Sequence, residues 1–242
     1  MSFPPSAGDQ GPGQPDPGDR LPELIAAAQA DPEGSATVAL IGLGRPAVDA
    51  VVAALAAEPV PGRRRQLVGL LAELAPDHLD RIEAAVEGAP WYLARNLAAV
   101  LGRVGRVEHL PVLEELLAHD HAAVRRESVR GMVRLGGVLA TAPLAARTAD
   151  PDAGVRRLAL HGLAEINTPT SLAALVLASR PGRPVGERRL ALSGLARSPR
   201  PEAEAGLREA ATRLAFSAAS RRVRAYARAL LARRPPRTVI FR

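Results

Sequence analysis

Apolar positions recur along this chain with a period of about 31 residues. One copy of this pattern begins at Val124. Its spacing places four residues on a single face of a helix: Val124, Ser128, Met132 and Leu135. One position of this face returns in seven copies, separated by 30 to 36 residues: Leu40, Leu71, Leu101, Met132, Leu163, Leu195 and Leu231. A period repeated so often predicts a repeat protein whose neighbouring units bury one continuous core.

A second apolar stretch with helical spacing follows most copies of the first, after a Gly, Pro or Asn. These second stretches cover residues 46–57, 107–118, 138–147, 169–179 and 201–218. Four of them carry a proline near the start, where the missing N–H costs a helix least: Pro46, Pro111, Pro169 and Pro201. The predicted unit is therefore a pair of helices joined by short turns, and the predicted fold class is all-α.

Two copies of the unit share a more specific motif. The segments DHAAVRRESVRGMVRLG and DPDAGVRRLALHGLAEI each contain an Asp, a Val-Arg pair a few residues later and a small residue before the next core position. This motif resembles the bacterial HEAT repeat, and the resemblance covers about residues 21–233. It implies a right-handed α-solenoid superhelix of about six HEAT-like two-helix repeats with a C-terminal capping helix, and it leaves the function open.

The resemblance also implies a role for the arginine that follows the first core position. In HEAT stacks this arginine commonly bonds the Asp of the preceding turn or its neighbour, which implies the pairs Asp120–Arg125 and Asp150–Arg156. The same position holds an arginine in three further copies: Arg64, Arg188 and Arg224.

The chain is predicted to have three parts. Residues 1–20 are Pro, Gly and Asp with almost nothing to bury, which predicts a disordered tail. Residues 21–234 form the repeat region. Residues 235–242 (PPRTVIFR) begin with two prolines that stop the last helix, which predicts a short extended tail.

Composition narrows the class of protein. There is no cysteine, which excludes disulfides, thiolate nucleophiles and cysteine-ligated metals. No signal peptide and no membrane span are recognisable, so a cytoplasmic location is expected. All 32 basic residues are arginine, a bias that indicates a GC-rich bacterial genome.

Charge is distributed unevenly. Residues 1–119 hold 9 Arg and 16 acidic residues, whereas residues 120–242 hold 23 Arg and 9 acidic residues. Five arginines occupy a position about 200° around the helix from the first core residue, and they predict an exposed basic stripe on the outer face: Arg65, Arg95, Arg126, Arg157 and Arg189. The stripe has two interpretations, a solvated face or an anion-binding surface for a nucleic-acid backbone.

Aromatic residues are rare, at 2% of the chain. Trp91 and Tyr92 are adjacent and form a candidate hot spot for a partner, although packing of Trp91 against the neighbouring repeat is the alternative. Phe216 and Tyr226 lie on apolar-periodic stretches and are expected to fill the end of the core.

The second helices of the later repeats carry almost no charge. Because such helices line the concave face of a solenoid, an uncharged one suggests a surface that a partner covers, while small side chains that tolerate water are the alternative. The candidate partner-binding residues on this face are Leu144, Arg147, Leu172 and Leu175.

The function that follows is binding rather than catalysis. The five histidines form no recurring His-Glu pair, and no phosphate loop or nucleophile triad is recognisable, so neither catalytic residues, a metal nor a cofactor is predicted. The leading hypothesis is an adaptor or assembly subunit that recognises a protein partner through the solenoid surface. The alternative is a nucleic-acid-associated protein that uses the Arg-rich C-terminal half, with a HEAT-like DNA glycosylase less favoured.

Overall fold

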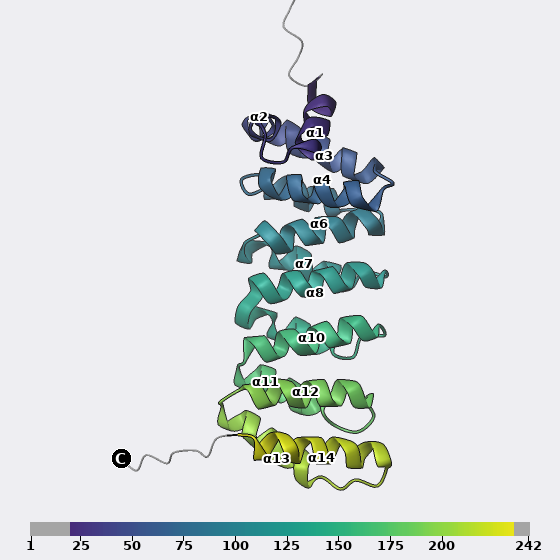
Figure 1. Cartoon of the computed structure of the whole chain (residues 1–242), viewed down its shortest axis with the longest axis vertical. Coiled ribbons are helices and arrows are strands. Elements are labelled where there is room, and N and C mark those ends of the chain that lie inside the picture. The colour runs from purple at the N-terminus through teal and green to yellow at the C-terminus, as the bar shows by residue number, and fades with distance from the viewer. Residues whose placement is uncertain (1–19, 235–242) are drawn as a thin grey trace, which may run out of the picture. The chain divides into compact units, whose positions relative to one another are not determined.

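The computed structural model of the chain describes residues 20–234, and these residues are α-helical with short 3₁₀ segments and no β-strand (Figure 1). The prediction of an all-α repeat fold is confirmed. Apart from Arg20, both predicted tails lie outside the described residues. The described chain divides into two compact units between Arg81 and Ile82.

The first unit contains four helices and the beginning of a fifth. They are α1 (Leu21–Ala30), α2 (Ser35–Leu43), α3 (Arg45–Ala57), α4 (Pro61–Leu74) and α5 (Leu79–Val86). Leu40, Leu55 and Leu71 are completely buried in its core. The exposed pair Arg81–Asp49 links α5 to α3 through two hydrogen bonds of 2.9 and 2.8 Å.

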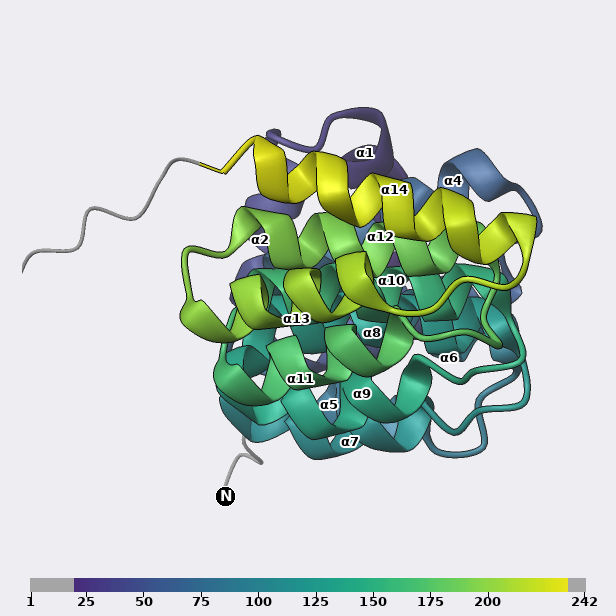
Figure 2. The ribbon, with the colours of Figure 1, turned by 90° about the horizontal axis from the view of Figure 1, so that it is seen from below.

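The second unit contains the rest of α5 and nine further helices. These are α6 (Trp91–Val104), α7 (Leu110–Leu116), α8 (Ala122–Gly136), α9 (Thr141–Arg147), α10 (Ala153–Ile166), α11 (Pro169–Ala178), α12 (Val185–Arg197), α13 (Pro201–Thr212) and α14 (Ala218–Ala232). Seen from below, α6, α8, α10, α12 and α14 form one layer, and α7, α9, α11 and α13 form the other (Figure 2). We call these the A layer and the B layer. Helix α5 comes directly before the A helix α6, as the B helix α7 comes directly before α8.

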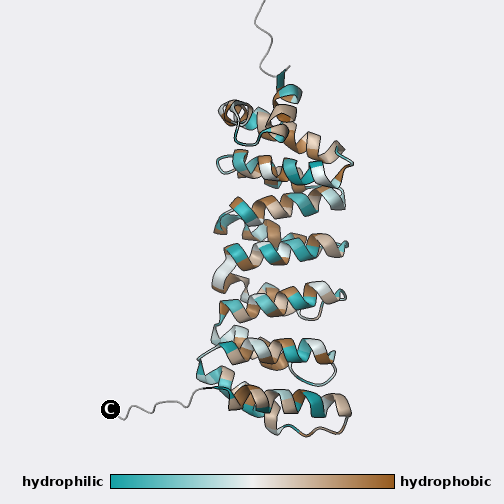
Figure 3. Cartoon of the chain, in the orientation of Figure 1, coloured by the Kyte–Doolittle hydropathy of each residue, from teal (hydrophilic) through white to brown (hydrophobic). Residues whose placement is uncertain are grey.

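The predicted core positions lie between the two layers. Leu101, Met132, Leu163 and Leu195 are at most 1% exposed, as the 31-residue period predicts. Apolar and polar residues alternate along the A helices, because only one face of each turns inward (Figure 3). Leu231 on the last helix is only half-buried, since no further described repeat covers it.

Helices α6 and α8 approach each other closely at two facing glycines. A β-carbon added to Gly102 of α6 would lie 2.7 Å from the α-carbon of Gly131 on α8. Only a residue without a side chain allows two backbones this near, so these glycines set the spacing between the two repeats.

Arginines connect consecutive repeats, and they bond the predicted partners Asp120 and Asp150 through backbone oxygens. Arg125 donates from Nε and Nη2 to the Asp150 carboxylate of the next repeat, at 2.9 and 2.8 Å. Its Nη1 binds the backbone oxygens of His119 and Asp120 in the preceding turn. Arg125 thus bonds the implied partner Asp120 through a backbone oxygen, while the carboxylate that it binds comes from the following repeat.

The next arginine follows the same rule. Arg156 donates from Nε and Nη2 to Glu187 Oε1 at 2.8 and 2.7 Å, and from Nη1 to the backbone oxygens of Asp150 and Pro151. Asp150 thus meets Arg156 through its backbone and Arg125 through its side chain. We call each such Arg–carboxylate contact between repeats a rung.

Some predicted helix boundaries are wrong. The stretch 138–147 is not one helix: a 3₁₀ segment (Gly137–Ala140) precedes α9. Gly137, the first residue of this segment, has a φ of 47°. Within the stretch 201–218, the helix ends at Thr212 rather than at residue 218. Helix α5 has no counterpart among the predicted second helices.

No single described helix is both long and apolar enough to cross a membrane. Helices α2 and α3 reach the required length and composition only when they are taken together, and they are bent by 113° relative to each other.

Candidate partner-binding site

The leucines predicted to contact a partner on the second helices are part of the core. Leu144, Leu172 and Leu175 are all 0% exposed. Each faces its own A layer rather than solvent, so their assignment to a binding surface is wrong. Arg147, the fourth residue of that set, is partly exposed and donates from Nη1 to the Leu117 backbone oxygen at 2.9 Å.

The predicted basic stripe is interrupted in the second unit. Arg126 bonds Asp152 on the next repeat through two contacts of 2.8 and 2.6 Å. The guanidinium of Arg189 lies 4.4 Å from the centre of the Tyr226 ring. Arg95 and Arg157 are exposed, as is Arg65 in the first unit. Anion binding by the stripe stays a prediction.

The aromatic pair has an unexpected neighbour. Trp91 is 45% exposed, and its ring stacks on that of His121 at a centroid distance of 3.9 Å and an angle of 11°. Tyr92 meets Trp91 edge-on at 6.1 Å. Trp91 therefore packs on the neighbouring repeat through one face, as the alternative interpretation expects, and its role as a hot spot for a partner stays a prediction.

The other two aromatic expectations differ in outcome. Phe216 is 87% exposed in the loop between α13 and α14, so its assignment to the core is wrong. Tyr226 is half-buried, and its hydroxyl lies 2.8 Å from Ser193 Oγ on the preceding A helix.

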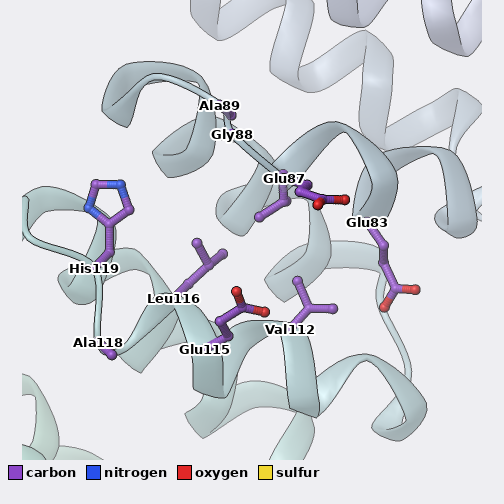
Figure 4. Close-up of a pocket in the computed structure, with 10 residues that line it drawn as sticks. Glu83, Glu87, Gly88, Ala89, Val112, Glu115, Leu116, Ala118 and His119 are labelled. Carbon is purple, nitrogen blue, oxygen red and sulfur yellow. The ribbon is translucent and has the colours of Figure 1, made fainter.

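A depression of about 620 Å³ lies between α5 and α7. Its apolar part is formed by Val86, Val112 and Leu116, and Ala89 and Ala118 lie at its border. Figure 4 shows Glu83 and Glu87 on the α5 side and Glu115 on the α7 side, with His119 at the other end. We call this depression the acidic pocket.

No arginine lines the acidic pocket, although arginine is the commonest charged residue of the chain. Glu87 and Glu115 are exposed and Glu83 is half-buried, and no described residue forms an ion pair with any of the three. Carboxylates without counter-charges around an apolar floor favour a ligand with a positive charge and an apolar body.

The acidic pocket is connected to the exposed tryptophan. His119 lines the pocket, and its Nδ1 accepts the backbone N–H of His121 at 2.9 Å. His121 in turn stacks on Trp91. His119 and His121 thus link the pocket to Trp91, the one tryptophan of the chain.

Sequence reasoning missed the glutamates of this pocket. Glu83 and Glu115 are separated by about one repeat, so the period itself was the signal that could have placed them side by side. Within residues 20–234, no group of three or more His, Asp or Glu side chains could hold a metal ion.

The fold and site describe a helical-repeat scaffold with a surface pocket, and the sequence comparison specifies the repeat. The family model for HEAT repeats matches residues 79–164. The match confirms the resemblance to HEAT repeats in this part of the chain. No curated protein sequence matches the chain.

Solved structures of other helical-repeat proteins are similar over most of the chain. The CpcE–CpcF complex of phycocyanin lyase from Nostoc sp. PCC7120 is 19% identical with a TM-score of 0.42, over 96% of this chain and 100% of the other. An archaeal HEAT-like repeat protein from Thermococcus onnurineus NA1 is 13% identical with a TM-score of 0.46, over 90% and 100%. Human deoxyhypusine hydroxylase is 13% identical with a TM-score of 0.36, over 89% and 97%. Similarity at this level says nothing about function.

Proposed function

We propose that this protein is a non-catalytic adaptor that binds a protein partner through the acidic pocket. The observation that supports the proposal is the set of Glu83, Glu87 and Glu115 around an apolar floor, without an arginine among the lining residues. The partner contributes a Lys or Arg side chain whose methylene stem packs on the floor while its charge meets the carboxylates.

The proposal revises the location that the sequence favoured. The fully buried leucines of α9 and α11 cannot contact a partner, whereas the pocket between α5 and α7 is open to one. Trp91 lies beside the pocket with nearly half of its surface exposed, and a large exposed aromatic ring is typical of binding hot spots. A cytoplasmic location belongs to the same proposal, and cell fractionation tests it.

The fluorescence of Trp91 provides the test. A short synthetic peptide with one Arg between two Leu residues should shift the emission in a saturable manner, and the same peptide with Gln in place of Arg should not. The double change Glu87→Gln and Glu115→Gln should weaken binding at least about tenfold, because two charge-assisted contacts worth about 1 kcal/mol or more are lost.

A neighbouring glutamate provides the control. Glu114 is exposed on the same helix as Glu115 but does not line the pocket, so Glu114→Gln should leave the affinity unchanged. Equal affinity for both peptides, or equal loss in both variants, would show that the pocket is not the binding site.

A further inference from the structure

The loop between α13 and α14 carries the two most exposed large apolar side chains of the described residues. Leu214 is 72% exposed and Phe216 is 87% exposed. The loop ends in an ordered helix start, because the Ser217 side chain accepts the backbone N–H of Ser220 at 3.1 Å and so caps α14. Large apolar side chains that a fixed loop holds in water are typical of a surface that another protein covers.

Two exposed arginines stand beside this loop. Arg221 donates from Nη1 to the backbone oxygen of Phe216 at 3.2 Å, which places its guanidinium next to the loop. Arg222 forms no hydrogen bond or ion pair with any described residue. Residues 210–234 contain seven arginines and no Asp or Glu, so this segment supplies no carboxylate of its own. We call these four residues the Phe216 surface: Leu214, Phe216, Arg221 and Arg222.

The acidic pocket has the complementary properties. Its carboxylates, Glu83, Glu87 and Glu115, surround an apolar floor, and no arginine lines it (Figure 4). Residues 107–119, which include α7, contain three glutamates and no arginine. An apolar side chain fits the floor and a guanidinium fits the carboxylates, and the Phe216 surface presents both together.

Within one chain these two surfaces are kept apart. The acidic pocket lies between α5 and α7, and the Phe216 surface lies at the α13–α14 loop at the other end of the second unit, with α8 to α12 stacked between them (Figure 1). The Phe216 surface of one molecule can therefore fill only the pocket of another molecule.

We propose that the partner of the acidic pocket is a second copy of this chain, which inserts its Phe216 surface. Phe216 packs on the apolar floor, and Arg221 and Arg222 meet the glutamates. This inference rests on the proposed function of the pocket and names its partner. The contact joins two different surfaces, so it either closes into a reciprocal dimer or continues along a chain of copies.

Sedimentation velocity of the full chain over a range of concentrations provides the first test. We expect the average mass to rise with protein concentration at low salt. We expect it to fall again at high salt, because ions screen the attraction between charges at the edge of the contact.

An exchange of charges makes the test independent of folding defects. One variant carries Arg221→Glu and Arg222→Glu, and the other carries Glu87→Arg and Glu115→Arg. Each variant alone has a pocket and a Phe216 surface of the same sign, so its association should weaken at least about tenfold. An equal mixture of the two should associate again, because each variant then meets a surface of the opposite sign.

The apolar contact has its own variant and its own control. Phe216→Ser should weaken association several-fold, whereas Leu177→Ser, which removes an exposed leucine from α11, should leave it unchanged. Arg233→Gln removes an exposed charge from the other end of α14 and is the control for Arg222→Gln, which should weaken association.

Three results would overturn the proposal: a monomer mass at every concentration, association that both double variants retain, and a mixture of the variants that stays monomeric. The Arg peptide of the preceding section separates this failure from failure of the proposed function. If the peptide binds in the pocket while the protein stays monomeric, the pocket has a different protein as its partner. If the proposal is correct, the same peptide dissociates the assembly.

Discussion

The two ends of the second unit differ in the sign of the charge that they leave without a partner. At the α5–α7 end, three glutamates surround the acidic pocket and no arginine lines it. At the α12–α14 end, Arg188 is buried and no described carboxylate bonds it. Between these ends, the rungs Arg125–Asp150 and Arg156–Glu187 pair both signs inside the protein.

This difference teaches that overall charge is a poor guide to a binding site. Residues 120–242 contain 23 arginines, yet several of them are occupied within the fold. Arg126 bonds Asp152, and Arg147 and Arg183 bond backbone oxygens of the preceding repeat. The informative positions are those at which the repeating pattern of pairs is broken.

The largest expected effect is in the middle, where the charges are paired. Asp150→Ala should lower the free energy of unfolding by about 3–5 kcal/mol, because it leaves the buried Arg125 guanidinium without its carboxylate. Urea denaturation monitored by circular dichroism measures the loss.

The exposed pair of the first unit is the control for this change. Asp49→Ala removes the partner of Arg81 at the surface, where both groups remain hydrated, and should have a much smaller effect. Equal losses in the two variants would mean that the rung does not stabilise the stack as a buried pair.

A smaller effect is expected at Asp152, and it should depend on pH. Hydrogen bonds from Arg126 hold the pKa of Asp152 below its ordinary value, and the backbone N–H groups of Val155 and Gly154 act in the same direction. The resulting stability is present above the ordinary pKa of about 4 and is lost as the pH falls toward the lowered value. Because the pair is partly exposed, Asp152→Asn should cost only about 1 kcal/mol at pH 7.

Denaturation of both proteins between pH 7 and pH 2 measures this dependence. Asn retains an oxygen that can cap α10, so the variant isolates the charge. The stability difference should be constant from pH 7 to pH 5 and narrow below about pH 4. A difference that persists unchanged at pH 2 would assign the effect to packing.

The sequence predicts the core of this fold well, because every repeat must bury the same helix face. The period that links Leu101, Met132 and Leu163 arises because all three are buried at the same position of their repeats. It does not reveal which side of an uncharged helix faces water. The uncharged sequence of α11 predicts an exposed Leu172 and Leu175, whereas Leu177 on the same helix is the exposed leucine.

The candidate sites depend on register between repeats, which the apolar period gives only to within a few residues. Helix α5 was missed, so Glu83 and Glu87 had no predicted neighbour. In α14 the buried residues are Val223 and Ala227, so the predicted Arg224 keeps its place after the first core residue although this helix begins three residues earlier, relative to its core, than α10 does.

The smallest effect is expected for arginines on the outer face of the A layer, and it sharpens the contrast with Arg188. Arg157 is exposed, so Arg157→Gln should change the free energy of unfolding by less than about 0.5 kcal/mol. Arg189→Gln should cost about 0.5–1 kcal/mol, since its guanidinium lies over the Tyr226 ring. A gel-shift titration with DNA at several salt concentrations then tests the basic stripe directly. If changing Arg95, Arg157 and Arg189 together abolishes a salt-sensitive shift, the outer face is an anion-binding surface after all, because exposed arginines bind phosphates through counterion release. If no shift occurs at low salt, the stripe is a solvated face.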